Sequence, residues 1–135
     1  LDSAVAYEGS LKLKEISYIH SESYAAGELK HGTISLITED MPVIAVATQR
    51  DVLDKTVSNI KEVKSRGAFT IVVTREGTDF DKDVADILVT VPETDDLLMP
   101  MTAVVPLQLI AYYTADLRGN DVDKPRNLAK SVTVE

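Results

Sequence analysis

Apolar positions follow two different patterns along the chain. Residues 2 to about 19 and 51 to 67 repeat apolar side chains every three or four positions, which predicts amphipathic helices. The runs at 42–48, 68–74 and 85–91 are short, continuous and rich in Val and Ile, as in strands buried on both faces of a parallel sheet. Residues 103 to 119 are apolar nearly all round, so we expect this helix in the core or in an interface.

The order strand, helix, strand, strand, helix, with short connections, predicts an α/β domain with a parallel sheet built by right-handed crossovers. Three strands are few for such a sheet, and the chain starts at Leu1 inside an expected helix. We therefore expect a fragment of a longer protein, with more strands upstream. Residues 21 to 37 read as a loop with one short helix.

Single residues refine the expected ends and faces of these helices. We expect Asp2 or Ser3 to cap the first helix and His20 to stabilise its carbonyl end. Pro106 fits the first turn of the last helix. In the second helix, the residues expected to face inward are Val52, Thr56, Ile60 and Val63, with Gly67 as its stop.

Three charges in the first helix, Glu8, Lys12 and Glu15, lie on one face at about 100° per residue. That face is the middle of the apolar stripe, which we expect to contain Val5, Leu11, Ile16 and Ile19, opposite a solvated side of Ser3, Ser10, Lys14 and Ser17. A buried unpaired charge costs several kcal/mol. The pattern therefore predicts either a structural ion-pair cluster or a polar pocket in which a desolvated carboxylate and a lysine move toward neutral pKa values. The two readings are equally supported.

Composition narrows the function classes. The absence of cysteine among the 135 residues excludes disulfides and Cys-based sites, and it suits a reducing compartment, so we expect a cytoplasmic protein. No apolar run approaches the ~20 residues that cross a bilayer, so we expect no membrane partner. Residues 76–96 hold eight acidic side chains and Lys82, so most of the net charge of -8 is local. With 5% aromatic residues and no basic stripe, we expect no nucleic acid partner.

Other candidate sites are weaker. His31 lies between Gly27 and Gly32 and is either an exposed loop histidine or an acid/base group near a ligand. Residues 79–83 imitate the start of a calcium loop but lack its glycine and glutamate, so we predict a solvated acidic loop and no metal. No phosphate-binding glycine motif occurs, and we expect no cofactor. Lys130, in a tail with alternating apolar residues, is either a surface lysine or a carbonyl-trapping amine.

Several stretches together resemble the glucosamine-6-phosphate synthase family: "EGSLKLKEISYIHSESYAAGELKHG", "SNIKEVKSRG" and above all the ending "DKPRNLAKSVTVE". The resemblance covers essentially the whole chain. It implies a sugar-isomerase (SIS) domain with three αβα layers, truncated at its N-terminal side. Residues 1–135 would be one partial domain, with 120–135 as an active-site tail.

The resemblance also implies roles for individual residues. Lys130 matches the lysine that forms an imine with the open-chain ketose, and Glu15 matches the carboxylate that carries a proton between C1 and C2. Lys12 matches a lysine that assists at the sugar. His31 matches a histidine linked to ring opening, which reaches the neighbouring subunit's site. The supporting or substrate-binding positions are Glu8, Arg126 and Ala129.

The chain departs from the family pattern at Ser10, Thr33 and Tyr113, none of which is proposed to act. The expected function is therefore the isomerase segment of an aminotransferase that makes glucosamine 6-phosphate from fructose 6-phosphate and glutamine-derived ammonia, working as a homodimer. The fragment alone is expected to be inactive. The alternatives are a non-catalytic sugar-phosphate-binding SIS module and a dimerisation fragment.

Overall fold

The computed structural model describes residues 1–81 and 83–126. Its centre is a parallel sheet of three strands in the order β1 (Pro42–Ala47), β2 (Phe69–Arg75) and β3 (Ile87–Val91). The register pairs Ala45 with Val72 and Val73 with Val89. The predicted parallel sheet is confirmed, with strand ends within three residues of those expected.

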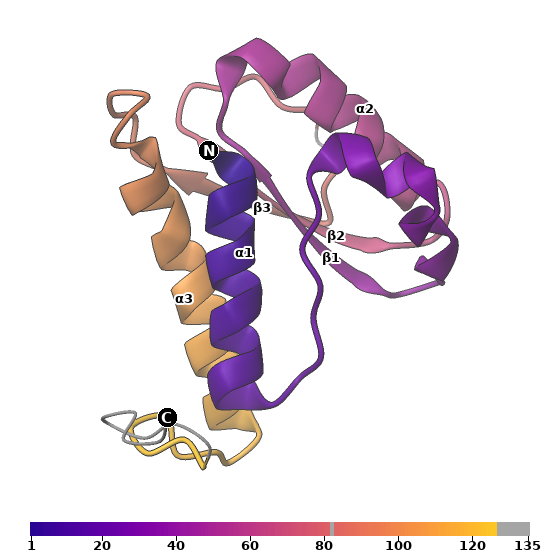
Figure 1. Cartoon of the computed structure of the whole chain (residues 1–135). Helices are drawn as coiled ribbons and strands as arrows, with labels where there is room; N and C mark the ends of the chain where they lie inside the picture. The colour runs from indigo at the N-terminus through magenta and orange to yellow at the C-terminus, as the bar shows by residue number, and fades with distance from the viewer. Residues whose placement is uncertain (82, 127–135) are drawn as a thin grey trace, which may run out of the picture.

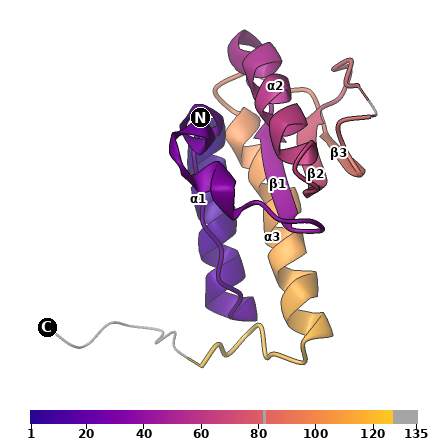
Figure 2. The same ribbon diagram turned by 90° about the vertical axis from the view of Figure 1, so that its right-hand side faces the viewer.

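Helices cover both faces of the sheet (Figures 1 and 2). The helix α2 (Leu53–Lys64) lies on one face, and α1 (Asp2–Lys12) and α3 (Met99–Leu117) lie side by side on the other. Successive strand residues point to opposite faces, so each face has its own core: Val46 and Val73 pack with α1 and α3, whereas Ala47 and Val72 pack with α2. The three-layer α/β prediction is correct.

The last helix begins earlier than predicted. It starts at Met99, so Pro100 lies in its first turn and Pro106 lies inside the helix. The start is set by Asp95, whose carboxylate accepts the N–H of Leu97 and whose carbonyl accepts the N–H of Met99. The apolar run that precedes residue 103 has no helical period, and this concealed the extra turn.

Two expectations for the other helix starts are wrong. Leu1, not Asp2 or Ser3, is the N-cap residue of α1, and no side chain caps it. The Asp2 carboxylate instead accepts the N–H and the hydroxyl of Thr48, at 2.8 and 2.5 Å, and thereby ties α1 to the end of β1. Val52 belongs to a 3-10 turn, η4 (Arg50–Val52), and is 40% exposed, so the inward face of α2 begins at Leu53.

The segment between α1 and β1 contains more helix than predicted. It forms two 3-10 helices, η2 (Ala26–His31) and η3 (Thr33–Leu36). Gly32 joins them with φ of 132°, a backbone conformation that a side chain would strain. The glycine therefore sets the angle between η2, which carries His31, and η3, which follows it.

Candidate functional site

The three charges of the first helix form an ion-pair cluster. Lys12 Nζ donates to Glu15 Oε2 at 2.6 Å and lies 3.6 Å from Glu8 Oε1. The side chains are 35% exposed for Lys12, 40% for Glu8 and 22% for Glu15. The hydrogen bond to Glu15 raises the pKa of Lys12, although partial burial opposes the shift. This is opposite to the shift toward neutrality that the pocket reading predicted for the lysine.

The charges do not lie in the middle of the buried stripe, as the sequence suggested. The side of α1 that faces α3 contains Val5 and Gly9, while Leu11 is 43% exposed. Ser17, expected in solvent, is fully buried, and its hydroxyl is satisfied by donating to the Leu13 carbonyl oxygen at 2.6 Å. The cluster is thus partly solvated, so its desolvation cost is smaller than that of a fully buried set of charges.

The helix changes its winding at the cluster. Residues Leu13–Ser17 form a π-helix, η1, directly after α1, and Glu15 lies within it. Short π-helices are rare and often mark functional sites. The wider turn also explains why Ser17 points into the protein, since residues after Lys12 no longer follow the 100° rotation of an α-helix. No residue pattern in the sequence signals this change.

Residues after α3 fold back onto the end of η1. The Asn120 side-chain amide donates to the carbonyl oxygens of Ile16 and Ser17, at 3.2 and 3.3 Å. The Arg126 N–H donates to the Tyr18 hydroxyl at 3.0 Å, and its guanidinium lies 4.0 Å from the Tyr18 ring centroid. The start of the predicted tail therefore packs beside the turn that carries Glu15. Lys130 and Ala129, the other predicted tail residues, lie outside the described residues.

His20 does not stabilise the carbonyl end of the helix. Its side chain is 83% exposed and lies 3.6 Å from Glu22, as a surface pair. The helix ends earlier, at Ser17, with Tyr18 in the left-handed conformation at φ of 60°. The tight stop leaves His20 beyond reach of the last helical carbonyls.

One chain does not bring His31 to the Glu8–Lys12–Glu15 cluster. His31 is exposed at the end of η2, and η2 packs against α2, where Lys30 lies 3.8 Å from Glu62. In Figure 1, η2 lies beside α2, whereas the C-terminal end of α1 points away from the sheet. The two parts of the predicted site are thus at different ends of the molecule.

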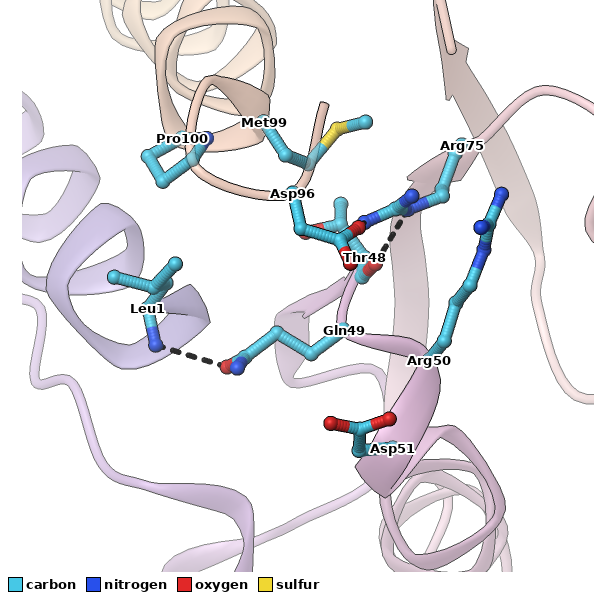
Figure 3. A pocket seen from close by; sticks show the side chains of 9 residues that line it. All are labelled: Leu1, Thr48, Gln49, Arg50, Asp51, Arg75, Asp96, Met99 and Pro100. Carbon is cyan, nitrogen blue, oxygen red and sulfur yellow. Dashed lines mark hydrogen bonds and ion pairs between the residues drawn. The ribbon is translucent and has the colours of Figure 1, made fainter. Parts of the chain in front are cut away.

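A small pocket of about 100 Å³ lies at the carboxyl ends of β1 and β2 (Figure 3). Ligands of open α/β sheets often bind at such an edge. Here, however, the buried Arg75 donates to the Thr48 carbonyl at 2.6 Å, to Glu93 at 2.9 Å and to Asp96 at 2.5 Å. The principal cation of the pocket is therefore already neutralised. We assign the network a structural role, joining two strand ends to the segment before α3.

The pKa values agree with that role. Burial by itself lowers the pKa of Arg75, but its hydrogen bonds to Asp96 and Glu93 outweigh this, and the pKa is raised. The same hydrogen bond lowers the pKa of Asp96. Both groups are held in their charged forms, as in a stable ion pair. The pocket and the Lys12 cluster also lie at opposite ends of α1. This helix is about 16 Å long at 1.5 Å per residue.

Acidic side chains of residues 76–96 pair with cations elsewhere in the chain, and one of these acidic side chains lies in 79–83, the predicted solvated acidic loop. Asp81 contacts Lys61 at 3.1 Å, and Asp86 pairs with Lys64. Among the residues that the structure describes, no group of three His, Cys, Asp or Glu side chains is arranged to hold a metal ion. Over the same residues, no helix has the length and hydropathy required to span a bilayer.

Comparisons with known proteins identify what the chain is similar to. The SIS domain family matches residues 1–117. The chain is 58% identical over its full length to the glutamine–fructose-6-phosphate aminotransferase (isomerizing) of Symbiobacterium thermophilum, and 59% to that of Clostridium acetobutylicum. It spans 22% of the length of each.

Solved structures give the same picture. The C-terminal domain of glucosamine-fructose-6-phosphate aminotransferase from Francisella tularensis matches with a TM-score of 0.80 and 41% identity, over 89% of this chain and 34% of that one. A glucosamine-6-phosphate deaminase from Thermotoga maritima matches with a TM-score of 0.69 and 26% identity, over 96% of this chain and 37% of that one.

Proposed function

Because the chain belongs to the SIS domain family, we propose that it is the C-terminal part of a glutamine–fructose-6-phosphate aminotransferase. In that enzyme it contributes to the isomerisation that forms glucosamine 6-phosphate. The observation that carries the proposal is 58% identity over all 135 residues to a relative of that name. The Lys12–Glu15 hydrogen bond supports it, because it places a carboxylate beside a cation on a partly exposed surface that a sugar can reach. The absence of cysteine agrees with a cytoplasmic enzyme.

Each proposed group has a distinct chemical task. The Lys130 amine attacks C2 of the open-chain ketose, a C–N bond forms, and water leaves to give an iminium ion. Ammonia then adds to C2 and displaces the Lys130 amine, so the lysine is released and the nitrogen of the product comes from ammonia. The resulting iminium withdraws electrons from C1, so the Glu15 carboxylate can take the C1 proton and return it to C2. Lys12 donates a hydrogen bond to Glu15 and fixes its position. Glu8 restrains Lys12 from the other side, at 3.6 Å.

Sugar phosphate is thus the proposed ligand, and a homodimer is the proposed assembly. The location of His31 supports the dimer. An imidazole that opens the sugar ring must reach the same sugar as Glu15. In one chain, however, η2, which carries His31, lies at the opposite end of the molecule from Glu15. A second subunit would supply His31 to each site.

Imine trapping tests the lysine and carboxylate assignments in the full-length enzyme. Borohydride with fructose 6-phosphate should label the parent enzyme and fail to label Lys130→Ala. Glu15→Gln should retain labelling but lose isomerisation about 10²-fold or more, the usual contribution of a general base. Glu22→Gln, an exposed carboxylate outside the cluster, is the matched control and should keep full activity. Labelling of Lys130→Ala as strong as that of the parent would show that the imine forms elsewhere.

Subunit mixing tests the shared site. His31→Ala and Lys130→Ala enzymes should each be inactive. When they are unfolded together and refolded, half of the dimers are mixed, and each mixed dimer has one intact site. Activity should then return to about a quarter of the parent value, as symmetric pairing predicts. If His31 acts within its own subunit, mixing restores nothing.

A further inference from the structure

Tyr18 combines three unusual features. It ends the π-helix that carries Glu15, it has φ of 60°, and it binds Arg126, which is 108 positions away in the sequence. A bulky residue in the left-handed region is a genuine outlier, and glycine is the usual choice at such a helix stop. Backbone strain of this kind persists where surrounding structure imposes it, and it clusters at functional sites.

The contacts explain what the strained conformation achieves. It directs the Tyr18 side chain toward the segment after α3, so that its hydroxyl accepts the Arg126 N–H at 3.0 Å and its ring stacks under the guanidinium at 4.0 Å. The Asn120 amide binds the adjacent carbonyls of Ile16 and Ser17. Residues 120 and 126 are therefore both attached to positions 16–18. We call this set of contacts the Tyr18 clasp.

The clasp is poorly suited to a purely stabilising role. The hydrogen bond to Arg126 is exposed, and exposed cation–π contacts contribute little. A glycine at position 18 would end the helix with less strain. What the clasp does achieve is to attach residues 120 and 126 to the turn that carries Glu15. Glu15 lies three residues before Tyr18, and Lys130 follows Arg126 by four residues, which span at most about 14 Å of chain.

We propose that Tyr18 is a positioning residue that holds the start of the lysine-bearing tail against the turn that carries Glu15. This inference rests on the proposed function and extends it, since Tyr18 itself is not expected to touch the sugar. It predicts that loss of the clasp lowers the rate of imine formation while substrate binding and folding are unaffected.

The test uses the full-length enzyme with three variants. Tyr18→Phe removes the hydroxyl that accepts the Arg126 N–H and keeps the ring, so kcat should fall about fivefold, as for one lost hydrogen bond. Tyr18→Gly removes both contacts between the Tyr18 side chain and Arg126 and relieves the backbone, so kcat should fall about tenfold or more while the thermal unfolding temperature stays the same or rises. Tyr7→Phe, on an exposed tyrosine of α1, should behave like the parent.

The readouts separate positioning from structure. KM for fructose 6-phosphate should stay within twofold of the parent, and the rate of borohydride trapping should fall in parallel with kcat. Both Arg126→Lys and Arg126→Ala keep the backbone N–H, but only Arg126→Lys keeps a positive charge for the Tyr18 ring, so it should retain more activity than Arg126→Ala. A Tyr18→Gly enzyme with parental kcat overturns the inference, as does one whose activity falls only together with its unfolding temperature.

These outcomes are distinct from failure of the proposed function. If Lys130→Ala is still labelled, Lys130 does not form the imine, whatever the activities of the Tyr18 variants. If Lys130→Ala is not labelled and the Tyr18→Gly enzyme is fully active, the imine assignment stands and only the positioning role of Tyr18 is refuted.

Discussion

Substitution of Gly9 by alanine should destabilise the protein, although alanine is the better helix former. Gly9 lies where α1 crosses α3, and a Cβ added there would lie 2.7 Å from Leu107 Cδ1 and 2.9 Å from Leu107 Cβ. The Cδ1 contact can be relieved by rotation of the side chain, but the Cβ contact cannot. Leu107 is 5% exposed and packs with Val5, Met99 and Ala103, so it has no free space to enter. The helices must therefore move apart.

Two opposing effects set the magnitude. Overpacking of a tight core costs about 1–3 kcal/mol, whereas replacing glycine by alanine inside a helix gains about 1 kcal/mol. The expected net change is a loss of about 1 kcal/mol in the free energy of unfolding. Because Glu8 precedes Gly9 on the same helix, the separation of α1 from α3 should also displace the cluster.

Urea unfolding followed by far-UV circular dichroism measures this loss. Ser3→Ala is the matched control, since Ser3 is an exposed residue of the same helix and the change adds helix propensity without a clash. The free energy of unfolding of the control should exceed that of the parent by a few tenths of a kcal/mol. If Gly9→Ala is as stable as Ser3→Ala, the close approach of α1 and α3 is not a constraint, and the reasoning is refuted.

Two further predictions concern carboxylates that tie elements together. Asp2→Ala should cost about 1–3 kcal/mol in urea unfolding, because the N–H and hydroxyl of Thr48 lose a partly buried acceptor; an unchanged midpoint would mean that water replaces the carboxylate. Asp86→Asn should show a pH-dependent loss of stability. The hydrogen bonds from Lys64 and Thr70 lower the pKa of Asp86 from 3.8 to about 2, so its contribution is fully present above pH 3.8 and is lost as the pH falls toward 2. The difference in urea midpoint between parent and Asp86→Asn should therefore be largest near pH 7 and shrink below pH 4, and a constant difference would contradict the assignment.

The sheet and its layers were predictable from short-range patterns. Continuous runs of Val and Ile indicate strands covered on both faces, and the sequence around Ile60 repeats with a helical period. Both signals depend only on neighbouring residues, and the structure confirms them. The placement of α3 in a core or interface was also sound in part: Ala103, Leu107 and Ala111 are buried, while its opposite side remains apolar and exposed.

The site was less predictable because its geometry depends on contacts between distant residues. A constant rotation of 100° placed Ser17 in solvent, but the π-helix turns it into the protein. Asp2 looked like a helix cap because aspartate commonly is one, yet its acceptors are better used by Thr48, 46 positions away. The residues next to Arg75 in the sequence do not indicate that its side chain is buried. Helical spacing grouped Lys12 with Glu15, only the family resemblance gave the two residues roles at the sugar, and only the structure joins them by a hydrogen bond.

The geometry of one chain also constrains how any complete site can be built. Glu15 belongs to the turn after α1, whereas His31 ends a 3-10 helix that packs on α2. The first segment contacts the residues after α3, and η2 packs against α2. If both groups act on one sugar, the imidazole must therefore come from a second copy of the chain. If they do not, His31 is a surface histidine and the ring opens by another group, so the mixing of His31 and Lys130 variants decides both the assembly and the role of the imidazole.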